Sequence, residues 1–141
     1  LHPAMLDDLG LKATIEWQIL ELSRRSKIKC DLVMNEDEFE LDSIKEKALF
    51  RIVQESLTNI MRHAKADKVS IVLENNKEGI ILCIKDNGVG IKAYDEKNHT
   101  TFGIFSMKER AFSLGGKLSI SSKLNKGTEI NLFIPTQLEH I

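Results

Sequence analysis

Three polar side chains, Glu55, Asn59 and His63, are spaced four residues apart in the middle of the chain. On an α-helix this spacing places them on one face. A carboxylate and an amide oxygen arranged in this way can hold a divalent cation, directly or through water. The carboxylate can alternatively polarise an attacking water or hydroxyl. The same spacing also fits a solvated polar helix face, so the trio does not by itself define a site.

A second candidate site is the segment Asp86-Asn87-Gly88-Val89-Gly90, which follows an apolar run. Its glycines let the backbone turn tightly and approach a ligand, and its aspartate can accept a hydrogen bond from an exocyclic amine. An ordinary turn has the same composition. The spacing matches neither the G-x-G-x-x-G dinucleotide fingerprint nor a Walker loop. An EF-hand is excluded because the alternating acidic ligands are missing.

The third candidate is Phe102-Gly103-Ile104, which we expect to open a helix. Free amides at a helix start favour phosphate, and a glycine allows close approach. The preceding polar stretch, Lys92–Thr101, lacks periodicity and fits a mobile lid, although a plain loop-to-helix junction is the alternative. A fourth candidate segment is Gly127-Thr128, which lies in the final hairpin.

The elements that must position these residues follow from apolar periodicity. We expect a helix over Leu9–Arg25 that begins near the acidic pair Asp7 and Asp8, followed by a strand over Lys27–Met34. The predicted apolar face of that helix is Leu9, Ala13, Trp17, Leu20 and Arg24.

A long helix to about His63 carries the polar trio. Ser43 to Glu46 has the form of a capping box at its start. The predicted apolar stripe of this helix is Ile44, Ala48, Ile52, Leu57, Ile60 and Ala64.

The remaining elements are strands and one helix. Val69–Leu73 alternates, Ile80–Lys85 is a nearly continuous apolar run typical of a buried central strand, and the helix from Gly103 ends at Gly115-Gly116. A final hairpin pairs Leu118 and Ile120 with Ile130, Leu132 and Ile134, and Pro135 ends it. This order predicts an α+β fold in which the helices cover one face of a mixed sheet.

The amino-acid composition limits the classes of function that this chain can have. The formal charge of the 141 residues is −1, which gives no basic excess for nucleic acid or an anionic membrane. Cys30 and Cys83 lie in apolar stretches and fit buried, reduced thiols, as in the cytoplasm. No apolar run approaches the roughly 20 residues of a membrane span. The chain begins at Leu1 rather than Met, so we expect it to be part of a longer protein.

The order of these motifs resembles the GHKL superfamily of gyrase B, Hsp90, histidine kinases and MutL. The segment from Phe50 to Ala64 is similar to the N box of histidine kinases, and the segment from Phe102 to Arg110 is similar to their second glycine box. The segment from Leu1 to Leu11 resembles the link to the dimerisation helices in the subclass that pairs with LuxR-type response regulators. The resemblance covers essentially the whole chain, with residues 1–10 as linker and 11–141 as the ATP-binding catalytic domain.

The resemblance implies a Bergerat fold, a two-layer α/β sandwich with a mixed, mostly antiparallel sheet and three helices on one face. It implies ATP and Mg²⁺ as ligands, with Asn59 as the metal ligand and Glu55 as the catalytic carboxylate. Asp86 would accept the adenine amine. The other implied ATP-binding residues are His63, Gly88, Gly90, Ile91, Phe102, Gly103, Ile104 and Thr128.

By the same resemblance, the partners would be the dimerisation domain of the same kinase, which carries the acceptor histidine, and a response regulator. None of His2, His63, His99 and His140 lies in an acceptor motif. The full protein would form a homodimer, with no direct contact to nucleic acid. Two other functions stay open: an anti-sigma-factor-type serine kinase, and a nucleotide-binding docking module without turnover. Thr101 and Ser106 replace glycines that the family often has around the lid.

Overall fold

The computed structural model describes residues 3–36, 39–91 and 103–136. The elements in chain order are α1 (Pro3–Arg25), β1 (Lys29–Met34), α2 (Ser43–Asn59), a π-helical turn η1 (Ile60–Ala64), β2 (Lys68–Asn75), β3 (Gly79–Asp86), α3 (Ile104–Ser113), β4 (Lys117–Lys123) and β5 (Gly127–Pro135). Phe102 and the predicted lid lie outside the described residues.

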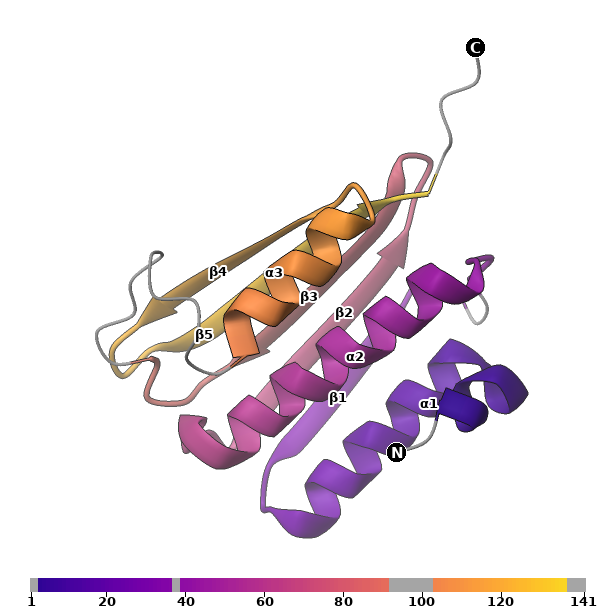
Figure 1. Cartoon of the computed structure of the whole chain (residues 1–141). Helices are drawn as coiled ribbons and strands as arrows, with labels where there is room; N and C mark the ends of the chain where they lie inside the picture. The colour runs from indigo at the N-terminus through magenta and orange to yellow at the C-terminus, as the bar shows by residue number, and fades with distance from the viewer. Residues whose placement is uncertain (1–2, 37–38, 92–102, 137–141) are drawn as a thin grey trace.

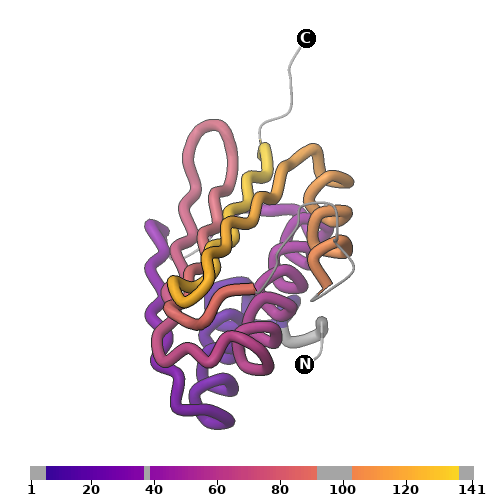
Figure 2. The backbone as a smooth tube through the Cα atoms, turned by 90° about the vertical axis from the view of Figure 1, so that its left-hand side faces the viewer, coloured from indigo at the N-terminus to yellow at the C-terminus, as the bar shows by residue number. Residues whose placement is uncertain are grey.

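The strands form one five-stranded sheet in the order β1-β2-β3-β5-β4. β1 pairs with β2 in parallel, and the other neighbouring pairs are antiparallel. The helices α1, α2 and α3 lie on one face of this sheet (Figure 1). Seen after a quarter turn, the sheet and the helices α2 and α3 form two layers (Figure 2). The predicted α+β sandwich is confirmed.

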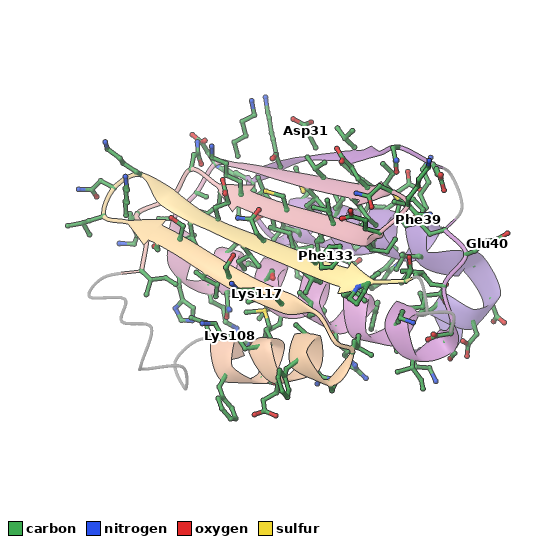
Figure 3. The ribbon with its side chains drawn as sticks, turned by 90° about the horizontal axis from the view of Figure 1, so that it is seen from above. Asp31, Phe39, Glu40, Lys108, Lys117 and Phe133 are labelled. Carbon is green, nitrogen blue, oxygen red and sulfur yellow. The ribbon has the colours of Figure 1, made fainter. Side chains whose placement is uncertain are left out.

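The central strand is β3, as the apolar run predicts, but this strand is buried on one face rather than on both. Ile80, Leu82 and Ile84 point toward the helices and are at most 1% exposed. Ile81, between them, is 37% exposed, because the described helices all pack on the opposite face. Phe133 on β5 lies on this uncovered face beside Ile81 (Figure 3).

The predicted apolar face of α1 is wrong. Leu9 and Leu20 are each 60% exposed. The stripe that packs on α2 is instead shifted by about half a turn, and its buried apolar members are Leu11, Ile15 and Leu22. Two leucines at helical spacing fit either face until the partner helix is known.

The start of α1 also differs from the prediction. The helical region begins at Pro3, and Gly10 breaks it with φ 85° and ψ 172°. Asp7 and Asp8 therefore lie in the turns before the break rather than at a helix start. Leu6, also before the break, is 1% exposed and belongs to the core.

The cap of α2 is one residue earlier than the predicted capping box. Asp42 is the N-cap, and its Oδ1 accepts a hydrogen bond from the Lys45 amide at 2.8 Å. Ile44 does not join the apolar stripe and is 71% exposed. Adjacent Asp and Ser are both good caps, and the packing of α2 selects the first.

The two cysteines are free but only half-buried, rather than buried as predicted. Burial, with a smaller effect of Asp31, raises the pKa of the Cys30 thiol to about 11. Burial also raises the pKa of Cys83. Both thiols therefore stay protonated at neutral pH. Among the described residues, no helix combines the length and apolar character needed to cross a membrane.

Candidate functional site

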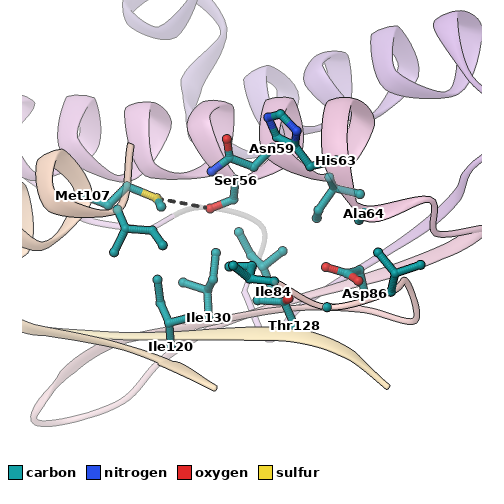
Figure 4. Close-up of a pocket in the computed structure, with 15 residues that line it drawn as sticks. Ser56, Asn59, His63, Ala64, Ile84, Asp86, Met107, Ile120, Thr128 and Ile130 are labelled. Carbon is teal, nitrogen blue, oxygen red and sulfur yellow. Dashed lines mark hydrogen bonds between the residues drawn. The ribbon is translucent and has the colours of Figure 1, made fainter. Parts of the chain in front are cut away.

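A cavity of about 260 Å³ lies between the end of α2, the loop after β3, the start of α3 and the sheet. Figure 4 shows Asn59 and His63 on the helix side of this cavity and Asp86 and Thr128 on the sheet side. The residues that line it are Ser56, Asn59, Ile60, His63, Ala64, Ile84, Asp86, Val89, Gly90, Ile91, Ile104, Met107, Ile120, Thr128 and Ile130.

The cavity brings together most of the residues predicted from sequence. Those that line it are Asn59, His63, Asp86, Gly90, Ile91, Ile104 and Thr128. Glu55, Gly88 and Gly103 do not line it, although all three lie in the segments that border it. Phe102 is outside the described residues.

The apolar floor of the cavity was not predicted. Ile84, Ile130 and Ile120 occupy one row across β3, β5 and β4, since Ile84 pairs with Ile130 and Ile130 pairs with Ile120. All three line the cavity. Alternation in each strand is visible in the sequence, but the row exists only once the register is set. A flat apolar floor suits a planar ring.

The end of the long helix is joined directly to the loop after β3. The last turn is π-helical, and the carbonyl of Ala64 accepts a hydrogen bond from the Val89 amide at 2.7 Å. Gly88 lies so close that an added Cβ would be 2.1 Å from this carbonyl oxygen. The carbonyl of Ala64 is the last of the helix and has no partner within it, so it can accept this bond, which holds the end of the helix against the loop.

Asp86 is a nearly buried carboxyl group at the end of β3, only 4% exposed. Its Oδ1 accepts a hydrogen bond from the Gly88 amide at 2.8 Å. Burial raises the pKa of Asp86, while hydrogen bonds from the backbone amides of Gly88 and Thr128 partly oppose the shift. The carboxylate is thus a strong acceptor in an apolar cavity.

Asn87, in the same motif, faces away from the cavity. Its Oδ1 accepts hydrogen bonds from the amides of Asp67 and Lys68 at 3.1 and 3.0 Å, and its Nδ2 donates to Asp67 Oδ1 at 2.6 Å. This side chain ties the loop to the start of β2. Asn87 therefore holds the loop in place. The motif from Asp86 to Gly90 does not by itself indicate this structural role.

The hairpin of β4 and β5 supports the loop from the other side. The Asn125 amide donates to the Val89 carbonyl at 2.7 Å. Ser122 Oγ accepts a hydrogen bond from the Ile91 amide at 2.7 Å. Sequence reasoning missed both contacts, because their partners are far apart in the chain, as Ile91 and Ser122 are at 31 positions, and meet only in the folded structure.

Glu55 and Gly103 lie against each other where α2 meets the start of α3. Gly103 is the N-cap of α3 with φ 68°, and an added Cβ would be 2.2 Å from Glu55 Oε1. The glycine therefore leaves room for the carboxylate one turn before Asn59.

Nothing in the described ranges 3–36, 39–91 and 103–136 forms a group of three His, Cys, Asp or Glu able to hold a metal ion alone. Mg²⁺ needs no such cage, because it commonly binds one or two protein oxygens together with phosphate oxygens and waters. The amide oxygen of Asn59, at the cavity wall, fits that mode.

The raised pKa of Asp86 leads to a pH prediction. At pH values between the ordinary pKa of 3.8 and the raised pKa, Asp86 is protonated in the folded state but ionised in the unfolded state. The contribution of Asp86 to the free energy of unfolding must then fall as pH rises through that window. Asp86→Asn removes this dependence, so wild type should lose stability relative to this variant as pH rises from 3 to 7, measured by urea unfolding.

Asp42 gives a control of opposite sign. The hydrogen bond from the Lys45 amide lowers the pKa of Asp42 below 3.8, so its stabilisation is present above that value and is lost as pH falls. Wild type should therefore gain stability relative to Asp42→Asn as pH rises. The difference in free energy of unfolding between wild type and variant should change with pH in opposite directions for Asp86→Asn and Asp42→Asn. The same direction for both variants would contradict the raised pKa of Asp86.

Comparison with known proteins gives one matching family, described as histidine kinase-, DNA gyrase B-, and HSP90-like ATPase, over residues 44–138. The oxygen sensor histidine kinase NreB of Staphylococcus carnosus is 35% identical over 135 residues, which cover 96% of this chain and 39% of that protein. The signal transduction histidine-protein kinase/phosphatase DegS of Bacillus subtilis is 36% identical over 142 residues, covering 97% of this chain and 37% of that protein.

Among solved structures, the blue-light activated histidine kinase of Erythrobacter litoralis EL346 superposes with a TM-score of 0.75 at 22% identity. The match covers 89% of this chain and 41% of that chain. The likeness supports the fold assignment. The chain spans less than half the length of the curated relatives that it matches.

Proposed function

The chain belongs to the histidine kinase-, DNA gyrase B-, and HSP90-like ATPase family, and from this premise we propose that it is the domain that binds ATP in a sensor histidine kinase. In the complete protein it would supply the γ-phosphoryl group to a histidine of the dimerisation domain. A response regulator aspartate would then accept that group.

The observation that carries this proposal is that polar groups lie on two facing sides of a largely apolar cavity. Asp86 and Thr128 lie on the sheet side, together with the apolar floor residues Ile84 and Ile130. The sheet side suits adenine, with the Asp86 carboxylate accepting a hydrogen bond from the exocyclic amine. Asn59 and His63, on the helix side, suit the phosphates.

Asn59 would hold Mg²⁺ through its amide oxygen, together with phosphate oxygens. Bound Mg²⁺ supplies neutralisation of the phosphate charge during transfer. The protein residues orient the nucleotide: Asp86 fixes the base and His63 lies toward the phosphates. Glu55 would orient or deprotonate the acceptor.

The partners follow from the same proposal. The relatives carry the names of histidine kinases, which supports a dimerisation domain with the acceptor histidine and a response regulator as partners. We propose in addition that the full protein is a homodimer and that this domain lies in the cytoplasm. Residues 1–10 would link the domain to the dimerisation helices, and the helix break at Gly10 lies at the end of that segment.

Glu55→Gln is the substitution that tests the catalytic step. The amide keeps the size of the side chain but cannot take a proton, so phosphoryl transfer by the full-length kinase should fall about 100-fold, the usual range for general-base loss. The KM for ATP should change by less than about threefold, since Glu55 does not line the cavity. Radiolabelled autophosphorylation measures both.

Gly103→Ala provides an independent route to the same group. The added methyl must displace the Glu55 carboxylate, because its Cβ would be 2.2 Å from Oε1. We expect transfer to fall while ATP binding by the isolated domain persists. Full transfer activity in both variants would refute a catalytic role for Glu55, and absence of any transfer in the full-length wild type would refute the kinase assignment.

A further inference from the structure

The face of the sheet away from the helices, here called the open face, carries apolar side chains with charged ones around them. The described helices all lie on the other face (Figure 1). Along each strand the side chains alternate, so the residues between the buried ones point to the open face. At its centre lie the exposed Ile81 of β3 and Phe133 of β5, which are paired in the register. Apolar side chains rimmed by charged ones on a surface are typical of a contact site.

The register arranges the open face in rows that cross β2, β3, β5 and β4. One row consists of Glu74, Ile81, Phe133 and Lys117, each paired with the next. The two ends of this row carry opposite charges, and its centre is apolar. Reversed end to end, the row presents a lysine where it had a glutamate and a phenylalanine where it had an isoleucine. The row is therefore complementary to its own reversal.

A second row on the open face has the same property. It consists of Ser70, Lys85, Glu129 and Ser121. Reversal of this row places the lysine opposite the glutamate and one serine opposite the other. The row between the two consists of the uncharged residues Val72, Cys83, Asn131 and Ser119. In the part of the chain that the structure describes, none of the four charged groups in these rows belongs to an ion pair.

We propose that the open face is a contact surface between two copies of this chain. A two-fold axis that runs along the strands, midway between β3 and β5, places the two open faces against each other. Each row then meets its own reversal, so Ile81 packs on Phe133 of the partner subunit and Glu74 pairs with Lys117 of the partner subunit. Face-to-face sheets with strands within about 30° of each other form ordinary β-sandwiches. Each contact occurs twice, as in any isologous interface.

The size of the open face predicts a weak dimer. Four strands about 4.8 Å apart, with about six residues each at about 3.3 Å per residue, make a face of roughly 400 Å² per copy. This is about half the area of a standard interface, so we expect a Kd on the order of 100 μM. Lys68 and Lys123, at the end of the sheet near the cavity, would face each other across the axis, and this like-charge pair limits the contact there. Two domains tethered in one homodimer would still associate, because their effective concentration reaches the mM range.

Reversal of single charges tests the contact. Sedimentation equilibrium of this chain at low salt, at up to about 1 mM, should show a reversible dimer. Glu74→Lys should raise its Kd at least about 10-fold, because two attractive pairs become repulsive, and Lys117→Glu should do the same. Glu16→Lys makes the same charge change at an exposed position of α1, on the helix side. This control should leave the Kd unchanged.

A mixture of the Glu74→Lys and Lys117→Glu variants gives the sharper result. In their heterodimer both pairs again have opposite charges, so the mixture should dimerise with about the wild-type Kd although neither variant does so alone. Within one copy, β2 and β4 are separated by β3 and β5, so the restored pairs must be intermolecular. A mixture of Glu16→Lys with Lys117→Glu has the same net charges and should dimerise more weakly, which excludes a general charge attraction.

Three results would each overturn the inference: a wild-type chain that stays monomeric at about 1 mM, an unchanged Kd in folded Glu74→Lys, or no dimer in the mixture of Glu74→Lys and Lys117→Glu. If Glu74→Lys does not fold, Lys85→Glu and Glu129→Lys give the same comparison in the second row. The inference does not rest on the proposed function, because the cavity lies on the other side of the sheet. ATP binding should therefore be the same in all these variants, and its absence in wild type would refute the proposed function alone.

Discussion

Asp86→Asn is expected to reduce the affinity for ATP about 100-fold while the chain stays folded. A hydrogen bond to a charged partner is worth about 1.5–3 kcal/mol, and the amide would present a donor or a weak acceptor to the adenine amine. Asp86 is 4% exposed, so water cannot replace the lost bond. Calorimetric titration with ATP and Mg²⁺ measures the change.

The fold should survive this substitution. The asparagine Oδ1 can still accept from the Gly88 amide, which bonds Asp86 Oδ1 at 2.8 Å in the wild type. The variant also buries no charge. Its thermal unfolding midpoint at neutral pH should therefore equal or exceed that of wild type.

Asp31→Asn is the matched control for this result. Asp31 is an exposed carboxylate on the sheet face away from the helices (Figure 3), and the same chemical change there should alter the Kd by less than about twofold, because an exposed side chain makes no desolvated hydrogen bond. An Asp86→Asn variant that is folded and binds ATP with wild-type affinity would contradict the site assignment.

Gly127→Ala is expected to give the largest loss of stability, about 3–5 kcal/mol. Gly127 has φ 93°, and an added Cβ would be 2.0 Å from the Asp86 carbonyl oxygen and 3.2 Å from Asn87 Cα. A side chain in this conformation costs about 1–3 kcal/mol. Relief of the backbone overlap costs a similar amount, roughly 1–3 kcal/mol. Denaturant unfolding measures the total.

Gly115→Ala separates the two costs. Gly115 has a similar φ of 73°, but its added Cβ would meet no closer atom than Pro135 Cγ at 3.7 Å. The loss should then be about 1–3 kcal/mol, the conformational part alone. Equal losses for the two variants would show that Gly127 is not tightly packed against the loop. Because that loop carries Asp86, Gly127→Ala should weaken ATP binding as well.

The candidate site could be predicted in part, because each predicted group belongs to a local motif. Asn59 and His63 share a helix face, and Asp86 follows an apolar strand, so spacing along the chain identified them. Ser122 gave no such signal. It meets Thr128 because β4 pairs with β5, and it meets Ile91 because the loop after β3 lies against that hairpin. A serine in an alternating strand usually faces solvent.

Local patterns were least reliable where two solutions have similar energy. Leu9 and Leu20 fit a helix face as well as Leu11 and Ile15 do, and α1 buries the second pair. Asp42 and Ser43 are equally good caps, and Asp42 is used. The cap of α2 differs from the prediction by one residue, and the buried face of α1 differs by about half a turn. In both helices the packing partner decides between the two solutions.

The sequence by itself determined the types and order of the elements, the position of the central strand and the polar residues of the helix that carries Asn59. These properties depend on periodicity and turn chemistry, which act over a few residues. The tertiary structure alone decided the strand order, the apolar floor, the bond from Val89 to Ala64 and the contacts of Ser122. They depend on register and on close approach of distant segments, where a shift of one residue reverses every side chain.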